Sequence, residues 1–485
     1  MPPCRTGGRI LTGNKEVRSL LYSTSRIILR KGGKHRALYA VLEGNMAAGR
    51  LVYNQTLFHI RNLYTGLKKD EKSRTENENK VIADVTAAIS DINAGRLSRG
   101  RPPAEYPSPE RPWLPEYLWM GVMGRILKDF YSRPSCFYSK LEQNAVRSAC
   151  RAVRSFTASM KDRARHPEKY RGRPKLPGYL KKDRAFTLVY DCQMVKLQTG
   201  RTRNSIRLAG LDPVLQTGKK EFCDIVQVSF SMKHGEIVAC ICEKKTDGTR
   251  PCHKPDPGRM IGIDPGVSNF LAVCPGFGAT PFIIPGGAIK AANQYYNKRK
   301  AALQEDLVKK EDRYTSRRLE RLGASRDHFI MNYFHQTARY IVNYAVSEMA
   351  GTIVIGQNVG WKQDADMGKA NNQKFTQIPH AAFFRILADK AQREGIRVVF
   401  TEESYTSRAS ALDRDPVPVW KEHQVIPEDF FSGRRIRRGM YVSCKGIILN
   451  ADINGAANII RKYDEKGLQE DLSYLSGSVR VVHVA

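Results

Sequence analysis

Apolar residues in the first third of the chain recur every three or four positions, the spacing of one helix face. The longest such run extends from Leu38 to Gly66 and predicts one long amphipathic helix or two shorter ones. The same spacing returns at 117–130 and 141–156. Residues 68–110 are charged and then rich in proline, which predicts a helix followed by a loop. We therefore expect a helical domain here.

The pattern changes after residue 185. Between 186 and 244 the apolar residues alternate with polar ones or form short runs, as in FTLVY, CDIVQVSFSM and EIVACICEK. This pattern predicts β-strands of a small sheet or barrel. The turn-rich stretch 246–258 marks a domain boundary.

The remaining apolar segments predict three strands, two helices, a strand, a helix, a strand and a final helix. They lie at 260–264, 270–274, 282–284, 287–325, 330–349, 352–355, 379–394, 397–401 and 452–461. The run TIVI at 352–355 is apolar throughout, which is typical of a strand in a sheet covered on both faces. This order of elements is typical of RNase H-like domains.

The charge balance points to a polyanionic partner. Lys and Arg number 80 and Asp and Glu number 48, a formal net charge of +32. Nucleic acid neutralises such a surplus, whereas no segment has the apolar stripe and basic face of a membrane-surface helix. No apolar run reaches about 18 residues, and the N-terminus lacks the apolar core of a secretory signal. Ten scattered cysteines without a CxxC pair favour reduced thiols, so we expect a cytosolic protein without membrane contact.

Residues 161–184 contain ten Lys or Arg and three acidic residues, and their Gly and Pro residues exclude a continuous helix. Such a segment either tracks a phosphate backbone or forms a solvated loop. The candidate nucleic-acid ligands in it are Arg171, Arg173, Lys175, Lys181 and Lys182.

Two aspartates have positions suited to metal-assisted phosphodiester hydrolysis, which needs several carboxylates around a metal pair. Asp264 ends an apolar strand, although the following Pro-Gly also allows a turn-capping role. Asp452 precedes small residues that let a helix approach a sheet, although it also reads as a helix N-cap.

These segments carry a family resemblance. IGIDPGVSNFLAV resembles the first RuvC motif of TnpB proteins and type V CRISPR effectors, and NADINGAANIIRK resembles the third. YNQTLFHIRNLYTGL and GRPKLPGYL resemble TnpB helical and wedge segments, and EESYTSRASALD with GQNVGWKQ and NNQKF resembles one TnpB subgroup. The resemblance runs from about 36 to 462.

The resemblance implies an α+β multidomain protein of the IS200/IS605 transposon-associated type. Its expected parts are a β-barrel wedge domain (1–35 and 157–255), an inserted helical recognition domain (36–156), a RuvC RNase H-like nuclease domain (256–400 and 447–465), a target-nucleic-acid-binding insert (401–446) and a tail (466–485).

One departure from the family concerns the second RuvC motif, which usually ends its strand in Glu. Here Gly356 follows TIVI. Either the site is inactive, or the acid comes from Glu402-Glu403 after the neighbouring strand RVVFT, about 4.8 Å away. Related eukaryotic TnpB-like nucleases have a Glu three residues before a Thr-Ser pair, as Glu403 stands before Thr406. We predict Glu403, with Glu402 as the fallback, because adjacent strand residues face opposite sides; two solvated acids are the alternative.

A second departure concerns zinc. Relatives often carry a four-Cys zinc ribbon between the second and third motifs, but here Ser410 and Asp413 fall about where two of the cysteines would be and only Cys444 remains. We expect no zinc, and an insert held by packing of Trp420, Phe430 and Phe431. The insert also offers a basic cluster, either a target-strand contact or a solvated turn: Arg434, Arg435, Arg437 and Arg438.

The resemblance implies an RNA-guided DNA endonuclease that cuts double-stranded DNA beside a short flanking motif. Asp264, Glu403 and Asp452 would bind two Mg²⁺ ions, which prefer carboxylate oxygens. The expected partners are a transposon-derived or CRISPR-type guide RNA and target DNA, with Tyr53, Asn54 and Gln55 facing the flanking duplex, and the expected state is a monomer. The alternatives are a catalytically inactive RNA-guided DNA-binding protein and a transposase proper.

Overall fold

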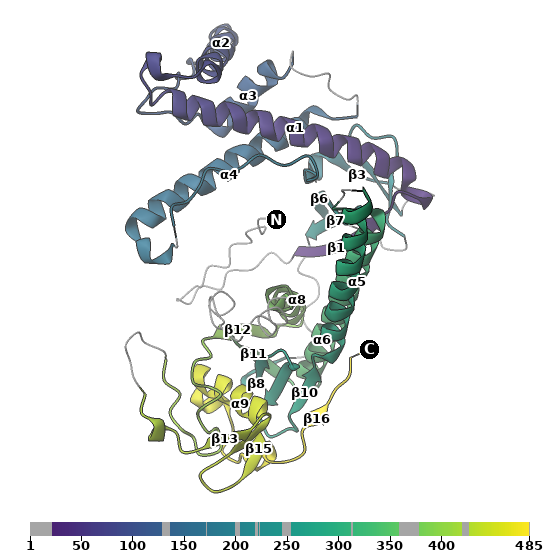
Figure 1. Ribbon diagram of the computed structural model, residues 1–485, viewed down its shortest axis with the longest axis vertical. Helices are drawn as coiled ribbons and strands as arrows, with labels where there is room; N and C mark the ends of the chain where they lie inside the picture. The colour runs from purple at the N-terminus through teal and green to yellow at the C-terminus, as the bar shows by residue number, and fades with distance from the viewer. Residues whose placement is uncertain are drawn as a thin grey trace. The chain divides into compact units, whose positions relative to one another are not determined.

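The computed structural model describes residues 22–128, 136–170, 172–198, 204–218, 222, 224–244, 254–311, 314–357, 378–419 and 426–484. The chain is an α+β protein with two compact units, Met1–Thr246 and Asp247–Ala485 (Figure 1). Within the described ranges, no helix has the length and apolar character needed to cross a membrane.

Four helices dominate the first unit: α1 (Arg36–Gly66), α2 (Glu76–Leu97), α3 (Glu116–Ile126) and α4 (Ser139–Arg165). The apolar run from Leu38 forms one continuous helix, α1, whose buried stripe packs against α2 and α4. Thr75 and Glu78 form a capping box that begins α2, because each side chain accepts a hydrogen bond from the other's backbone N–H. α4 extends to Arg165 and ends there, so the basic segment 161–184 begins as helix but is not a continuous helix, as predicted.

The strands of the first unit form two antiparallel sheets, ordered β1-β7-β6-β2 and β3-β4-β5. They are β1 (Tyr22–Leu29), β2 (Leu188–Asp191), β3 (Val195–Leu197), β4 (Ser205–Leu208), β5 (Leu215–Gln216), β6 (Asp224–Lys233) and β7 (Glu236–Lys244). Among the described strands these pairings leave two open sheets, so the closed barrel predicted from sequence is not formed by them. Alternation identified the strands but carries no information on their partners.

The second unit is built on a six-stranded sheet ordered β12-β11-β8-β9-β10-β16. Its strands are β8 (Asp256–Pro265), β9 (Asn269–Pro275), β10 (Phe282–Pro285), β11 (Ala350–Gly356), β12 (Arg397–Thr401) and β16 (Arg480–Val481). β8, β9 and β10 form the predicted antiparallel meander. β11 runs parallel to both β8 and β12, so these three strands end at the same edge.

Helices cover both faces of this sheet. Ile261, Ile263 and Ile353 pack with α6 (Arg317–Ser347) and α8 (His380–Arg393) in one cluster. Met260 and Val354 point to the other face and pack with α9 (Ala451–Tyr463). The buried faces explain why TIVI is apolar throughout. α5 (Gly287–Glu311) ends before α6 begins, which divides the helical region predicted over 287–325.

Glycine brings α9 close to the sheet. A Cβ on Gly262, in the middle of β8, would lie 2.2 Å from the carbonyl oxygen of Ala456 in α9. Real Cβ atoms do not approach backbone atoms so closely, so only glycine permits this packing. The small residues of NADINGAANIIRK therefore have the role predicted for them, and the edge of β8 lies directly beside the start of α9.

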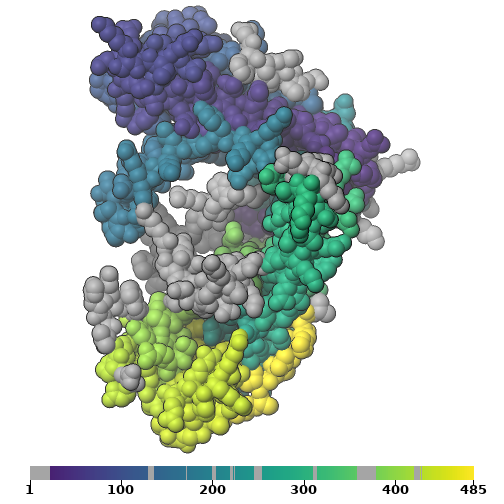
Figure 2. All heavy atoms as spheres, in the orientation of Figure 1, coloured from purple at the N-terminus to yellow at the C-terminus, as the bar shows by residue number. Residues whose placement is uncertain are grey.

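An insert between β12 and α9 contains a three-stranded sheet of β13 (Arg434–Arg437), β14 (Met440–Val442) and β15 (Ile448–Asn450). It lies on the surface of the second unit (Figure 2). Phe431 is buried as predicted, but Phe430 is 39% exposed and does not belong to a core. Trp420 lies outside the described residues. Tyr441, fully buried, takes the central place in the packing instead.

Short 3-10 turns complete the described chain. They are η1 (Gly33–His35), η2 (Glu71–Ser73), η3 (Pro167–Lys169), η4 (Cys192–Met194), η6 (Glu428–Phe430), η7 (Glu465–Gly467) and η8 (Ser473–Leu475).

Candidate active site

Asp264 stands at the end of β8 and faces α9. Side chains alternate along a strand, so Asp264 shares the face of Met260 and Gly262. A Cβ on Gly455 of α9 would lie 2.7 Å from Asp264 Oδ2. The missing side chain of Gly455 therefore makes room for the carboxyl group against the helix.

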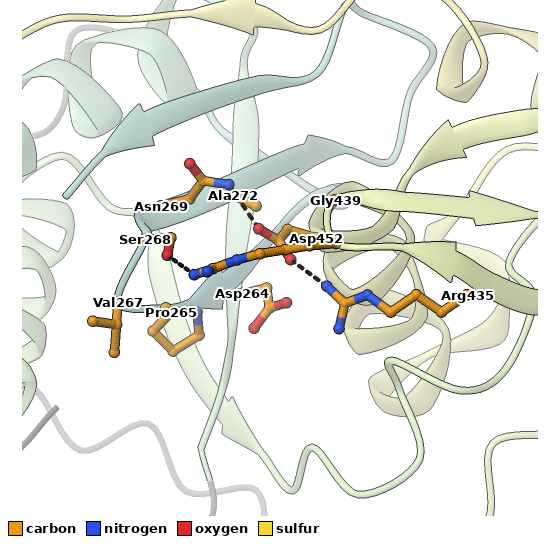
Figure 3. A pocket seen from close by; sticks show the side chains of 11 residues that line it. Asp264, Pro265, Val267, Ser268, Asn269, Ala272, Arg435, Gly439 and Asp452 are labelled. Atoms are coloured by element: carbon orange, nitrogen blue, oxygen red, sulfur yellow. Dashed lines mark hydrogen bonds and ion pairs between the residues drawn. The ribbon is translucent and has the colours of Figure 1, made fainter. Parts of the chain in front are cut away.

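Asp452 is the second residue of α9, and its carboxylate is held from two sides. Asn269 Nδ2 donates to Oδ2 at 2.7 Å, and the Arg435 guanidinium lies 3.5 Å from Oδ1 (Figure 3). The reading of Asp452 as the helix N-cap is wrong. Asn450 is the cap, because its Oδ1 accepts from the backbone N–H groups of Asp452 and Ile453. This cap leaves the Asp452 carboxylate available to the pocket.

A pocket of about 580 Å³ joins these groups. Asp264 and Asp452 line it together with Asn269 and the arginines Arg435 and Arg438 of the insert (Figure 3). The pocket therefore combines two acids with basic side chains from another part of the unit.

Glu403 follows β12, and its carboxyl group lies in front of Gly356. A Cβ built on Gly356 would be 3.1 Å from Glu403 Oε2. Gly356 pairs with Thr401 in the parallel β11–β12 ladder, so both strand ends reach this point. Ile459 of α9, whose Cδ1 would lie 2.6 Å from that Cβ, and Glu403 together fill the space into which a side chain at Gly356 would extend.

Glu402 points elsewhere. Its carboxylate accepts from Lys462 Nζ at 2.5 Å and from the Ser404 backbone N–H at 2.6 Å. Lys462 is only 4% exposed at its side chain and also donates to the carbonyl oxygens of Ser404 and Pro418. Glu402 neutralises this buried cation, which makes it a poor fallback for the site.

The electrostatics of the acids differ from those of ordinary surface carboxyls. Burial, followed by the charges of Glu403 and Asp452, raises the pKa of Asp264 well above its usual value, against the opposing effect of Arg435. Burial and then the charge of Glu402 raise the pKa of Glu403 to about 7, although Lys462 lowers it. Burial alone would raise the pKa of Glu402, but its hydrogen bonds to Lys462 and Ser404 lower it. The Asp264 carboxyl group therefore lies near enough to both Glu403 and Asp452 to feel their charges.

This donor set suits a hard divalent cation. Carboxylate oxygens are the ligands that Mg²⁺ prefers, and a cation would relieve the repulsion that raises these pKa values. In the described conformation, no three His, Cys, Asp or Glu side chains among the described residues already converge on one metal position. The chemistry fits a metal ion, while the side chains are not yet arranged as a closed ligand shell.

The basic segment of the first unit lies along α1. Asn54 and Leu180 exchange two hydrogen bonds, Nδ2 to the carbonyl oxygen at 2.9 Å and backbone N–H to Oδ1 at 2.8 Å. Arg61 donates to the Pro177 carbonyl at 3.0 Å, and Arg50 donates to that of Lys182. These bonds hold the backbone in an ordered path without helix or strand. The basic side chains along it are exposed: Arg173, Lys175, Lys181 and Lys182.

These contacts change the reading of the α1 residues predicted to face DNA. Both ends of the Asn54 amide are engaged by Leu180, so its place is structural. Tyr53 packs against Phe186, with ring centroids 6.1 Å apart, and is half-buried. Gln55 is half-buried, and its carbonyl oxygen lies 2.8 Å from His59 Nδ1. Arg171 lies outside the described residues.

The four arginines of the insert differ in the groups that they contact. Arg435 reaches Asp452, and Arg438 donates to Ser268 Oγ beside it. Arg437 donates to Met440 Sδ within the hairpin, and Arg434 is exposed. The sequence analysis missed Asn269 as a partner of Asp452. The antiparallel return of β9 along β8 would have placed it near Asp264, because Pro265 pairs with Leu271.

Two family models match the chain. Residues 241–362 match the OrfB_IS605 model, described as a probable transposase, and residues 380–459 match the Cas12f1-like TNB domain. The first range contains Asp264, and the second contains Glu403 and Asp452. A comparison with curated proteins returned no match.

Solved structures match over most of this chain at low similarity. A cryo-EM structure of a Cas12f1–sgRNA–target DNA complex has 12% identity and a TM-score of 0.31, covering 91% of this chain and 100% of that chain. A CRISPR-Cas12f ternary complex has 10% identity and a TM-score of 0.31, covering 82% and 81%. Alicyclobacillus acidoterrestris C2c1 with single-guide RNA has 13% identity and a TM-score of 0.26, covering 90% and 33%.

The assignment rests on the two family models, since TM-scores near 0.3 add no structural argument. Together the models span the candidate site from β8 to α9. They confirm the resemblance predicted from the motifs: over residues 241–362 and 380–459 the chain is similar to the transposase and Cas12f1-like families that these models describe.

Proposed function

We propose that the protein is an RNA-guided DNA endonuclease, in which an RNase H-like (RuvC) domain hydrolyses double-stranded DNA beside a short flanking motif. The observation that carries the proposal is the placement of Asp264 at the end of β8, Glu403 after β12 and Asp452 at the start of α9, where the charges of Glu403 and Asp452 both act on Asp264. An antiparallel meander extended by two parallel strands agrees with an RNase H-like domain. Residues so far apart in sequence converge here without forming a hydrophobic core, which favours a functional role.

Asp264, Glu403 and Asp452 would hold two Mg²⁺ ions in this function. When bound, such a pair activates the attacking water and stabilises the leaving oxygen. The protein's own groups prepare the acids. Asn269 fixes the orientation of the Asp452 carboxylate through the bond to Oδ2. Lys462 draws Glu402 away, so that Glu403 alone faces the site.

Nucleic acid would be bound by charge. A net charge of +32 destabilises a compact chain unless phosphates offset it. The ordered basic segment along α1 offers exposed Arg173, Lys175, Lys181 and Lys182 to a phosphate backbone. Arg435 and Arg438 supply positive charge in the pocket itself. A guide RNA would read the target by base pairing, which leaves the protein to read only a flanking motif.

Plasmid cleavage with the copurified guide RNA and Mg²⁺ tests the proposal. Asp264→Ala and Glu403→Gln should each lower the cleavage rate by about 10³-fold or more, the scale of losing a group that acts in the transition state. Glu402→Gln, one residue away, is the matched control and should stay within a few-fold of wild type. If Glu402→Gln lost cleavage and Glu403→Gln did not, Glu402 and not Glu403 would be the acid of the site.

A second candidate is an RNA-guided binding protein without nuclease activity, and Gly356 at the end of β11 favours it. That protein would retain target DNA in a gel-shift assay with guide RNA, yet leave it uncut in Mg²⁺ or Mn²⁺. The OrfB_IS605 model is described as a probable transposase, so a transposase proper is the third candidate. Copurification of a discrete RNA would favour the guided nuclease, and joined DNA ends without RNA would favour the transposase.

A further inference from the structure

Asp413 lies at the centre of a hydrogen-bonded cluster in the insert. Its carboxylate accepts from Ser410 Oγ at 2.6 Å, Ser432 Oγ at 3.1 Å and Cys444 Sγ at 3.0 Å. It also accepts from the backbone N–H of Cys444 at 2.9 Å. One carboxylate therefore gathers three side chains that are distant in sequence, two of them from the region where relatives carry zinc-binding cysteines.

A second acid binds the same partners. Asp415 Oδ2 accepts from the backbone N–H groups of Ser410 at 2.8 Å and Ser432 at 3.0 Å. Its Oδ1 lies 2.6 Å from Ser432 Oγ, so Asp413 and Asp415 share the single proton of that hydroxyl group. Ser410 is fully buried and Asp415 is 6% exposed. We call Ser410, Asp413, Asp415, Ser432 and Cys444 the carboxylate knot. Hydrogen bonds to ionised groups are the strong ones, so this knot is a firm attachment.

The knot ties both ends of one hairpin. Ser432 stands two residues before β13, and Cys444 stands two residues after β14. Between them the strands pair antiparallel, and Tyr441 in β14 donates to the Arg408 carbonyl at 2.7 Å. Arg435, which lies in β13 three residues after Ser432, reaches Asp452 from this hairpin. The knot therefore holds the base of the element that places an arginine at the candidate active site.

The protonation states of the side chains in the knot suit hydrogen bonding rather than metal binding. Zinc in a structural site needs thiolates or neutral imidazoles, and Cys444 is the one residue of the knot able to supply such a ligand. Its hydrogen bond to Asp413 raises the pKa of the Cys444 thiol, which disfavours the thiolate. Burial alone would raise the pKa of Asp413, but hydrogen bonds from Cys444, Ser410 and Ser432 lower it below its usual value. An ionised acid surrounded by donors results.

We propose that the carboxylate knot replaces the structural zinc ion of related inserts, and that Asp413 is a positioning residue that keeps Arg435 beside Asp452. The positioning part rests on the proposed nuclease function, whereas the metal-free attachment of the hairpin does not. The two parts therefore need separate readouts.

Zinc dependence is measured on the full-length wild-type protein. Elemental analysis should find no stoichiometric zinc, and 1,10-phenanthroline should leave the thermal unfolding midpoint unchanged. A stoichiometric zinc ion whose removal lowers that midpoint overturns the proposal, whether or not the protein cuts DNA.

Hydrogen exchange of the β13 and β14 amides tests the attachment. Asp413→Ala should speed exchange there roughly tenfold or more, the factor that loss of one hydrogen bond to a charged group corresponds to. Asp429→Ala, an exposed acid of the same insert, is the matched control and should leave exchange unchanged. Equal exchange in both variants and the wild type overturns the role of the knot.

Replacing the knot by a metal gives the sharpest test. The triple variant Ser410→Cys, Asp413→Cys and Ser432→Cys, with native Cys444, places four thiols where the knot now converges. It should bind Zn²⁺, show the absorption of tetrahedral thiolate-bound Co²⁺, and regain the slow exchange lost in Asp413→Ala. Failure to bind either ion contradicts the convergence of these four positions.

Activity separates a positioning role from simple stabilisation. Asp413→Ala should lower the cleavage turnover about tenfold and weaken the affinity for guide RNA and target by only a few-fold, because the other basic side chains stay in place, and the zinc-loaded triple variant should recover turnover. Unchanged turnover in Asp413→Ala, with faster hairpin exchange, would overturn the positioning role while leaving the metal-free attachment standing.

Discussion

Glu78, buried in the first unit, and Glu403, half-buried in the second, have opposite electrostatics. Glu78 of the first unit is 5% exposed at its side chain, accepts from Lys69 Nζ at 2.8 Å and from the Thr75 backbone N–H at 2.9 Å, and begins α2. The Lys69 bond, followed by that of Thr75, lowers its pKa to about 2. Burial and a neighbouring acid instead raise the pKa of Glu403 to about 7.

This difference in pKa distinguishes an acid that stabilises the fold from one that is suited to a functional role. Glu78 has its hydrogen bonds and its countercharge within the fold, so its ionised form stabilises the native state. Glu403 lies beside other acids, so its ionised form destabilises the native state until a cation arrives. A chain tolerates such a cost mainly where the charge has a use, which is why the contrast favours the second unit as the reactive one.

The most stringent test of the role proposed for Glu403 moves the acid from the end of β12 to the end of β11. Glu403→Gly should lower cleavage by about 10³-fold or more, and adding Gly356→Glu should restore a substantial part of it. The double variant removes the Glu403 carboxyl from the space in front of Gly356, so that the Ile459 side chain, whose Cδ1 would lie 2.6 Å from the new Cβ, is the neighbour that must shift. Plasmid cleavage measures both steps. A folded double variant with no recovery would show that the two strand ends are not equivalent.

Glu78→Gln should destabilise the first unit. A shift in pKa from 4.5 to about 2 corresponds to about 3 kcal/mol of stability at pH 7, at 1.36 kcal/mol per unit. The folded pKa is depressed, so this stability is present above pH 4.5 and is lost as pH falls toward 2. Urea unfolding at several pH values should show the two proteins converging in acid. A constant difference across that window would contradict the pairing.

Glu403→Gln should have the opposite effect on the metal-free protein. The folded pKa is raised, so the wild type loses stability as pH rises from 4.5 through about 7, because the unfolded chain ionises first. At pH 8 the variant should be more stable than the wild type by about 1–3 kcal/mol, and the two should agree near pH 4. Added Mg²⁺ should stabilise the wild type and not the variant. A variant less stable at pH 8 would refute the repulsion.

A pair of glycines extends the contrast to smaller effects. Gly95 in α2 has no atom within 4 Å of an added Cβ, so Gly95→Ala should stabilise by roughly 0.5–1 kcal/mol through helix propensity. Gly455→Ala in α9 would meet Asp264 Oδ2 at 2.7 Å. It should lower cleavage about tenfold by displacing that carboxyl group. Melting temperatures and cleavage rates of the two variants check both statements, and a fully active Gly455→Ala would contradict the close fit.

Much of the second unit was predictable because fully buried strands have a simple sequence pattern. TIVI and RVVFT are the predicted strands β11 and β12, and they are parallel neighbours as expected. This register also brought Glu403 to the end of β11. The choice between Glu402 and Glu403 could be posed from alternation, but its outcome depends on Lys462, whose position relative to β12 follows only from the packing of α9.

Contacts between segments far apart in sequence could not be predicted from the pattern of apolar and polar residues. The approach of Arg435 to Asp452 depends on how the hairpin folds back, and four exposed arginines in a row look alike in sequence. Asn54 lies on a helix face that could bind either DNA or protein, and periodicity does not name the partner. Ser410 and Asp413 were noticed as missing cysteines, yet their hydrogen bonds to Ser432 and Cys444 required the folded insert.

The crowding between Gly356 and Glu403 also bears on how such sites change over time. A side chain at both positions would compete for one volume, and a side chain at neither would leave the site short of an acid. A glutamate that moved from one strand end to the next would therefore pass through few viable intermediates. If Glu403 serves as proposed, a sequence comparison that looks for the acid only at the position of Gly356 would classify such proteins as inactive. Their acid would in fact be present, at the end of the neighbouring strand.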